Sequence, residues 1–219
     1  TGKPKAIKLQ KQAMVHSAIA TGDFFNLKPG DSALHCLSTE YIAGKMMLVR
    51  AMILGLELDL TAPSSQLIFN DDKTYDFCAM VPMQLQKTKS FCTNIKTIIV
   101  GGAPVPDSLI AAIQKVNSNV YETYGMTETI THIAVKKLNN FRESSVQVKK
   151  ALFKTLPNIS ISLDNRNCLV IEAPNLSKKT IGTNDLVKIH SNSDFEWLGR
   201  YDNIINTGGV KVFPEQIEA

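Results

Sequence analysis

The run Thr97–Val100 narrows the possible folds most, because four β-branched residues in succession leave the segment without a polar face. A continuous run of this kind is typical of a parallel strand that is buried on both sides. The run stops at Gly101, and Pro106 then begins a helix that we predict to continue to about Val116. Strand, turn and helix in this order indicate one unit of an α/β sheet with helical crossovers.

The first 135 residues or so repeat this alternation of strand and helix. Apolar residues between Ile42 and Ile53 recur at spacings of three and four, which predicts an amphipathic helix, and Pro82 can open another. Further short strands are predicted at Ser32–Ser38, Glu57–Thr61, Phe77–Val81 and Val120–Thr123. We therefore expect an α/β fold with a mixed parallel sheet flanked by helices.

The chain becomes β-rich after about Lys137. Strand-like runs flank the polar turn Asp164–Asn167, which is typical of a hairpin, and a second strand pair turns at Ser191–Ser193. A small hairpin is predicted between residues 204 and 213. We expect residues 1–199 to form a large domain that includes the β-rich subdomain. Residues 200–219 are expected to form a hinge and the start of a small α+β domain.

Composition argues against several classes of function. The chain has 219 residues and a net charge of +4, and its lysines are scattered, whereas nucleic-acid binders gather basic residues on one face. No segment reaches the roughly 18 consecutive apolar residues of a membrane span. The four cysteines form no C-x-x-C pair, so we expect reduced thiols in a cytoplasmic protein and no zinc site. Thr1 stands where a natural start would have Met, so we expect the N-terminus to be missing. The oligomeric state stays open.

Two glycine-containing segments have residue types suited to a nucleotide. In Thr1–Lys5, a glycine and two lysines offer free N–H groups and positive charge to phosphate, although a solvated basic terminus is an alternative interpretation. Gly101–Ala103 follows a predicted strand, where ligands of open α/β sheets bind, and its small residues would let a flat ring approach. An ordinary strand-to-helix turn is equally compatible with that segment.

The segment Glu122–Thr129, also just past a predicted strand, combines residue types that suit a nucleotide and a metal ion. Tyr124 offers an aromatic face to a base, and Thr127 offers a hydroxyl to a phosphate. Glu128 is a hard carboxylate of the kind that holds Mg²⁺ together with substrate phosphates. The competing interpretation of Glu128 is a solvated loop acid, but the combination favours function.

In this order, the three segments resemble those of the adenylate-forming superfamily, which includes acyl-CoA synthetases, luciferases and the adenylation domains of peptide synthetases. Further matches are Thr183–Asp185, Gly199–Asp202 and Gly208–Glu218, so the resemblance spans nearly the whole chain. It implies a large adenylate-forming domain and a two-step ligase. A small carboxylic acid and ATP would give an acyl-adenylate and pyrophosphate, and CoA would then displace AMP.

The resemblance also implies roles for individual residues. Those expected to contact the nucleotide are Thr1, Gly2, Lys3, Lys5, Gly101, Gly102, Ala103, Glu122, Tyr124, Gly125, Met126, Thr127, Asp185 and Arg200. Within this set Tyr124 would stack on adenine and Asp185 would bind the ribose hydroxyls. The catalytic residues would be Thr127, at the α-phosphate, and Glu128, as the ligand of Mg²⁺. Asp202 matches the hinge of the small domain, and Gly208 and Gly209 would lie near the path of the CoA thiol.

The chain departs from the family pattern in three places. Asn184 stands where the family has glycine, but the neighbouring Asp185 is kept, so ribose binding is expected to survive. The Ser/Thr/Gly-rich half of the phosphate loop does not precede Thr1, and the family's catalytic lysine lies beyond Ala219. We therefore expect the chain as written to adenylate poorly.

Within the superfamily the chain looks most like the o-succinylbenzoate–CoA ligases of menaquinone biosynthesis. That acid is a dicarboxylate, so its pocket should offer a cation or several hydroxyl donors. Candidates are Ser38, Tyr41, Thr131 and His132, although His132 also suits a packed strand. Two alternatives stay open: a ligase for another aryl or medium-chain acid, and a module that only binds AMP or an adenylate.

Overall fold

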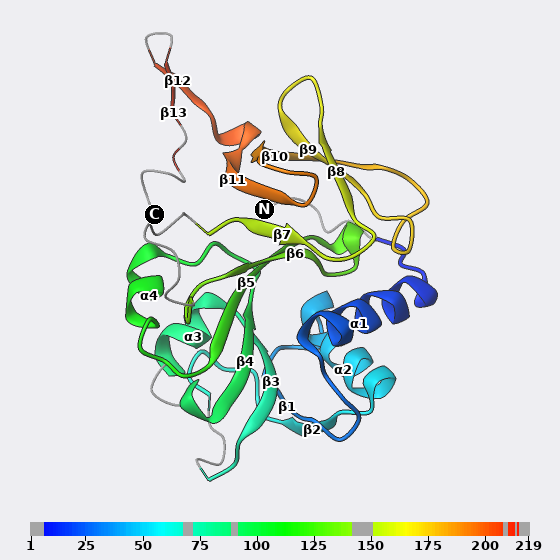
Figure 1. Ribbon diagram of the computed structural model, residues 1–219, viewed down its shortest axis with the longest axis vertical. Coiled ribbons are helices and arrows are strands. Elements are labelled where there is room, and N and C mark those ends of the chain that lie inside the picture. The colour runs from blue at the N-terminus through cyan, green and yellow to red at the C-terminus, as the bar shows by residue number, and fades with distance from the viewer. Residues whose placement is uncertain are drawn as a thin grey trace.

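Eleven strands form one sheet in the computed structural model, which describes residues 7–67, 72–88, 92–141, 151–207, 210–212 and 214 (Figure 1). Their order across the sheet is β2-β1-β3-β4-β5-β6-β7-β11-β10-β9-β8. Residues 1–6, 208 and 209 lie outside the described residues, so the predictions for Thr1, Gly2, Lys3, Lys5, Gly208 and Gly209 stay predictions. No helix among the described residues is long and apolar enough to cross a membrane.

The first five strands of that order pair in parallel, as the sequence predicts. They are β1 (Ser32–His35), β2 (Glu57–Leu60), β3 (Tyr75–Met80), β4 (Ile95–Val100) and β5 (Asn119–Gly125). Helices α1 (Lys11–Phe25) and α2 (Ile42–Leu54) cover one face, and α3 (Pro82–Thr88) and α4 (Asp107–Ala112) cover the other (Figure 1).

Both faces of this parallel half are buried, which explains its β-branched and apolar strands. Phe77 and Ile99 pack with α2, whereas the adjacent Cys78 and Ile98 pack with α3 and α4. Alternate residues of each strand therefore belong to two separate cores, because successive side chains of a strand point to opposite faces. The two cores fix the sheet and hold the carboxyl ends of β4 and β5 side by side.

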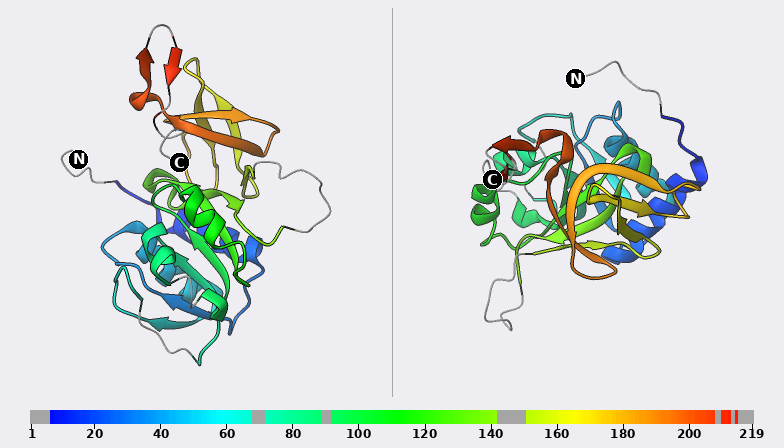
Figure 2. Two further views of the ribbon diagram at one scale, coloured as in Figure 1. Left: turned by 90° about the vertical axis from the view of Figure 1, so that its left-hand side faces the viewer. Right: turned by 90° about the horizontal axis from the view of Figure 1, so that it is seen from above.

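The remaining strands run antiparallel and form the β-rich part at one end of the molecule (Figure 2). They are β6 (His132–Lys137), β7 (Phe153–Thr155), β8 (Ser160–Leu163), β9 (Cys168–Glu172), β10 (Ile181–Ile189) and β11 (Asp194–Arg200). Phe153 and Phe195 stack in their core with ring centroids 5.4 Å apart. Among the strands that the structure describes, the three-residue β7 alone links β6 to β11.

A second sheet follows the end of the large one. The short helix η3 (Tyr201–Asn203) leads into β12 (Ile205–Thr207) and β13 (Val210–Val212), which pair antiparallel. The hairpins predicted at Asp164–Asn167 and near the end of the chain are confirmed. The domain boundary predicted between residues 199 and 200 falls at the last residue of β11 and stays a prediction.

Two helices differ from the sequence analysis. The 15-residue α1 was not predicted, and α4 ends at Ala112 and not near Val116. The cause of the early end is Asn139, whose side-chain nitrogen lies within 3.3 Å of the carbonyl oxygens of Ile113, Val116 and Ser118. These carbonyls find a partner outside a helix, which removes the need for further helical turns.

Candidate active site

Two of the nucleotide-type segments, Gly101–Ala103 and Glu122–Thr129, lie at the neighbouring carboxyl ends of β4 and β5, where ligands of open α/β sheets bind. Gly101 follows β4 and lies so close to the hydroxyl of Thr123 that a β-carbon would overlap it. Gly102 has a φ of +87°, which favours glycine. The loop after β4 is therefore a bare backbone surface, continued by the exposed Ala103, as expected for the wall of an adenine pocket.

Glu122 lies beneath this loop and is only 6% exposed. One carboxylate oxygen accepts a hydrogen bond from the N–H of Val105 at 3.2 Å. The other is 2.5 Å from the ammonium of Lys136, which also lies over the ring of Phe153. The carboxylate thus ties the loop to the sheet through protein partners. Direct contact of Glu122 with a nucleotide stays a prediction.

Tyr124 and Asp185 come from strands on opposite halves of the sheet and meet directly. The Tyr124 hydroxyl donates to a carboxylate oxygen of the buried Asp185 at 2.6 Å, and Arg200 lies 3.6 Å from the other oxygen. Burial, followed by the charge of Asp185, raises the pKa of Tyr124 far above its usual value. Tyr124 is therefore a protonated, fixed ring, and three residues far apart in the sequence form one polar group.

The loop Met126–Thr131 connects β5 to β6 and carries the Thr-Glu pair in a short helix, η2 (Thr127–Thr129). Glu128 is exposed, and its carboxylate has no protein partner among the residues that the structure describes. In that same part of the chain no three acidic, histidine or cysteine side chains gather to hold a metal. A single free carboxylate fits Mg²⁺, which commonly takes one or two protein ligands and completes its shell with phosphates and water.

A second polar group surrounds Arg50, which the sequence analysis did not select. Arg50 is 2% exposed, and its guanidinium donates to the hydroxyls of Thr21 at 3.3 Å and Thr131 at 3.1 Å. The Ser17 hydroxyl is 3.0 Å from that of Thr131. Burial lowers the pKa of Arg50 to about 10, so it stays charged near neutral pH. No carboxylate among the described residues lies within ion-pair distance of it.

His132 adjoins the Arg50 group and begins β6, as the alternative interpretation of a packed strand histidine expects. Its Nε2 lies 3.5 Å from the Thr21 hydroxyl. Burial, followed by the charge of Arg50, lowers the pKa of His132 to about 3. The ring is therefore neutral at physiological pH and can offer hydrogen bonds but no charge.

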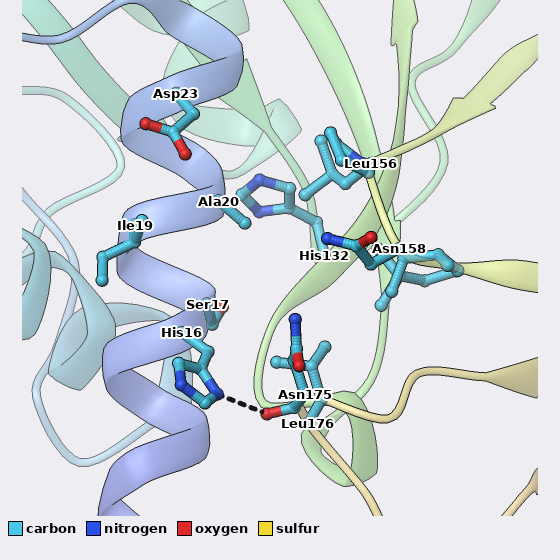
Figure 3. Close-up of a pocket in the computed structure, with 13 residues that line it drawn as sticks. His16, Ser17, Ile19, Ala20, Asp23, His132, Leu156, Asn158, Asn175 and Leu176 are labelled. Carbon is cyan, nitrogen blue, oxygen red and sulfur yellow. Dashed lines mark hydrogen bonds between the residues drawn. The ribbon is translucent and has the colours of Figure 1, made fainter.

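A cavity of about 150 Å³ opens beside His132 and Ser17, between α1 and the segment that follows β7 (Figure 3). Apolar walls come from Ile19 and Leu156, and the N–H of His16 Nδ1 closes one side by donating to the carbonyl of Asn175 at 3.0 Å. A cavity of this size holds a benzene-sized ring. The mixed lining suits a small molecule with an aromatic part and polar ends.

The other residues predicted for the acid pocket lie elsewhere. Tyr41 is 70% exposed just before α2, and Arg50 is about 12 Å further along that helix at 1.5 Å per residue. The Ser38 hydroxyl accepts from the N–H of Glu40 in an exposed turn. Of the candidates, only Thr131 and His132 join the buried group. Arg50 could have been selected from the sequence, because it and Lys45 are the two charged residues of a helix that is otherwise apolar.

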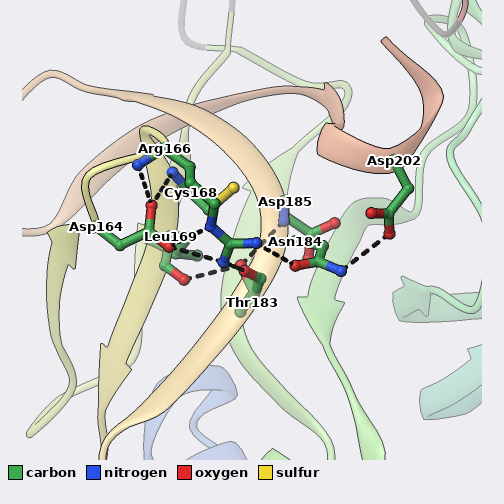
Figure 4. A network of polar contacts seen from close by, with 8 residues as sticks. All are labelled: Asp164, Arg166, Cys168, Leu169, Thr183, Asn184, Asp185 and Asp202. Carbon is green, nitrogen blue, oxygen red and sulfur yellow. Dashed lines mark hydrogen bonds and ion pairs between the residues drawn. The ribbon is translucent and has the colours of Figure 1, made fainter.

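The predicted hinge is tied to the strand before it (Figure 4). The Asn184 amide donates to the carboxylate of Asp202 at 2.9 Å, and its oxygen accepts from Arg166 at 2.9 Å. Arg166 in turn lies over the ring of Tyr201 at 5.3 Å. The residue that departs from the family's glycine therefore supplies a side chain that contacts the hinge position.

Comparisons with known proteins identify the family of the chain. A family model described as AMP-binding enzyme matches residues 1–166. The 2-succinylbenzoate–CoA ligase of Geobacillus sp. (strain WCH70) is 25% identical over 252 residues, which cover 100% of this chain and 50% of that protein. The chain thus spans about half the length of the curated relatives that it matches.

Two solved structures show the same fold. The acyl-CoA synthetase (AMP-forming)/AMP-acid ligase II-like protein from Dyadobacter fermentans DSM 18053 is 43% identical, with a TM-score of 0.81, over 99% of this chain and 62% of that one. The O-succinylbenzoate coenzyme A synthetase from Bacillus subtilis, solved in complex with ATP and magnesium ion, has a TM-score of 0.79 at 20% identity. That match covers 100% of this chain and 52% of the other, and at this identity it concerns the fold alone.

Proposed function

The chain belongs to the AMP-binding enzyme family, and we propose from this premise that the protein is an acid–CoA ligase acting on o-succinylbenzoate. The acid would react with ATP to give the acyl-adenylate and pyrophosphate, and CoA would then take the acyl group and release AMP. Both steps are proposed for the whole protein, because the chain covers about half of its curated relatives.

The observation that carries the choice of acid is the buried Arg50 without a carboxylate partner among the described residues. Only one carboxylate of a dicarboxylic acid attacks the α-phosphorus, so the other has to be bound. Burying that second charge is costly unless a cation and hydrogen bonds compensate it. Arg50, with the hydroxyls of Thr21 and Thr131, offers both. Thr131 lies three residues after Glu128, so the acid and phosphate sides share one loop.

For the nucleotide, the residues present fit the roles expected of them. Gly101 and Gly102 leave room for adenine against the backbone, and Tyr124 would stack on it from a position fixed by Asp185. Asp185 would accept the ribose hydroxyls. Glu128, whose carboxylate has no partner among the described residues, would hold Mg²⁺, which would offset the charge of the phosphates when bound. Thr127 would orient the α-phosphate, so these side chains contribute positioning and electrostatics.

Removing the charge of Arg50 tests the proposal. We expect Arg50→Met to weaken binding of o-succinylbenzoate by roughly 1.5–3 kcal/mol, or about ten- to a hundredfold, because a hydrogen-bonded ion pair is lost. The two monoacids that each lack one carboxylate serve as matched ligands. The wild type should discriminate against the monoacid that lacks the Arg50-bound carboxylate, and the variant should not. Calorimetry with each acid and with ATP separates acid binding from nucleotide binding.

Two results would favour the alternatives. Equal affinity of the wild type for the dicarboxylate and both monoacids would indicate another aryl or acyl acid. Nucleotide binding without any exchange of pyrophosphate into ATP, in a protein that includes the family's lysine, would indicate a module that only binds. An unchanged affinity for o-succinylbenzoate in Arg50→Met would contradict the role given to Arg50.

A further inference from the structure

One hydroxyl closes the loop that carries the Thr-Glu pair. Thr129 is fully buried, and its Oγ1 accepts from the N–H of Met126 at 3.0 Å. The same oxygen lies 2.9 Å from the carbonyl oxygen of Met126 and 2.7 Å from that of Thr131. Both ends of the loop are therefore tied to one side chain that no ligand can reach. Thr129 is not among the residues for which the sequence predicts a role.

The next residue holds the loop in a rare conformation. Ile130 has φ 67° and ψ −63°, and the N–H of Thr131 donates to the carbonyl of Thr129 at 2.8 Å. These values define a γ-turn of the rare, strained kind, and a β-branched residue at positive φ is an outlier. Ile130 is 1% exposed and packs with Ala18 of α1 and Met46 of α2. Burial of its side chain between the two helices holds the turn in place.

The base of the loop is closed by a glycine. Gly125 ends β5 opposite His132, at an irregularity in the β5–β6 register. A β-carbon on Gly125 would overlap the carbonyl oxygen of Thr131 and the α-carbon of His132. The two ends of the loop thus approach as closely as backbone allows. The loop therefore has little conformational freedom. It is closed by bare backbone at its base, by the Thr129 hydroxyl in its middle and by the turn at Ile130.

We propose that Thr129 and Ile130 are positioning residues that set Glu128 at a fixed separation from Thr131, and hence from Arg50. Glu128 lies exposed on one side of the loop, and Thr131 contacts Arg50 on the other. The inference rests on the proposed metal role of Glu128. A loop held in this way would present the metal-binding carboxylate and the acid-binding hydroxyl in one arrangement, with no reorganisation when ligands bind.

The matched pair Thr129→Val and Thr129→Ser tests this role. Valine has the shape of threonine but cannot bond to either end of the loop, whereas serine keeps the hydroxyl. We expect Thr129→Val to weaken ATP binding at saturating Mg²⁺ at least tenfold while AMP affinity changes less than threefold. Thr129→Ser should keep the wild-type Mg²⁺ dependence. A wild-type magnesium titration in Thr129→Val, or equal losses in both variants, would overturn the proposal.

A second variant keeps the test decisive if Thr129→Val does not fold. Ile130→Gly leaves Thr129 in place but removes the buried anchor, and glycine adopts positive φ without steric cost. The same selective loss of Mg²⁺-dependent ATP binding is expected, and equal losses for ATP and AMP would contradict the inference. No acid is present in these titrations, so their failure leaves the Arg50 assignment untouched. A wild-type titration curve in Glu128→Gln would instead remove the metal role, and with it the positioning role.

Discussion

His132 makes the stability of the protein depend on pH. Its pKa in the folded state is lowered to about 3 by burial and by Arg50, against 6.5 for the ordinary side chain. Between these values the unfolded chain binds a proton that the folded chain excludes. Above pH 6.5, His132 therefore does not lower the free energy of unfolding. As the pH drops from 6.5 toward 3, the free energy of unfolding falls by up to about 1.4 kcal/mol per pH unit.

The variant His132→Gln should remove this dependence, because glutamine stays neutral throughout. Between pH 7 and pH 5 we expect the unfolding free energy of the wild type to fall by about 2 kcal/mol more than that of the variant. Urea unfolding of both proteins at the two pH values measures this difference. An equal fall of the unfolding free energy in the two proteins would mean that His132 titrates normally in the folded protein.

Single residues of the site were predictable where a motif marks them and not where packing creates them. Tyr124 and Asp185 could be selected because each stands in a recognisable segment, but their contact across 61 residues could not be seen in the sequence. Arg50 stands in no motif and is marked only by its place in a largely apolar helix, whereas Thr129 ends the segment Glu122–Thr129 but has a residue type that suggests no role there. Their importance comes from burial, which depends on α1 and α2 closing around them.

At the scale of the elements, Asn139 joins the segment after α4 to β5. Its side-chain oxygen accepts from the N–H of Val120 at 2.9 Å, and its nitrogen satisfies carbonyls of the segment that follows α4. Asn139→Ala would leave these buried groups unpaired, so we expect a loss of about 2–4 kcal/mol of unfolding free energy by urea unfolding. The control is Asn26→Gly, because Asn26 is exposed, has a φ of 55° and makes no side-chain hydrogen bond among the described residues. This variant should change stability by less than about 1 kcal/mol. Equal losses in the two variants would contradict the role of Asn139.

The parallel strands were predictable from their β-branched runs, whereas α1 was not predictable from periodicity. Its buried face consists of small residues, among them Ala13, Ser17, Ala18 and Gly22. Such residues let α1 approach α2 closely but leave no stripe of large apolar side chains in the sequence. The helix also begins without a side-chain cap at Gln10. The same small residues bring Ser17 close to Thr131, so the helix that was not predicted is also one wall of the acid site that we propose.

At the scale of the whole molecule, the contact of Asn184 with Asp202 joins the large sheet to the segment that leads into the second one. Asn184→Gly, which restores the residue typical of the family, should release this segment. An exposed hydrogen bond of about 0.5–1.5 kcal/mol corresponds to a change of up to roughly tenfold in the opening equilibrium. We expect limited proteolysis between residues 201 and 207 to accelerate by about that factor.

The control for this experiment is Asn167→Gly. Asn167 lies in the neighbouring β8–β9 turn with a φ of 64°, so glycine is tolerated there, and no hydrogen bond of its side chain to the hinge occurs among the described residues. Its proteolysis rate should match the wild type. Equal rates in both variants would show that Asn184 does not restrain the segment, and the hinge role of Asp202 would lose its structural support.

The short length of β7 affects how firmly the two parts of the large sheet are joined. Few ladder hydrogen bonds join the helix-flanked strands to the β-rich end, because β7 offers only three residues to each neighbour. The hydrophobic core of the β-rich end also takes in Ile133 and Ala134 of β6. The two parts of the sheet therefore meet at a seam along β7 that has few backbone hydrogen bonds and is held largely by side-chain packing. Tyr124 and Asp185 lie on opposite sides of that seam. A nucleotide that bound both residues would stabilise the association of the two parts in proportion to its own binding free energy.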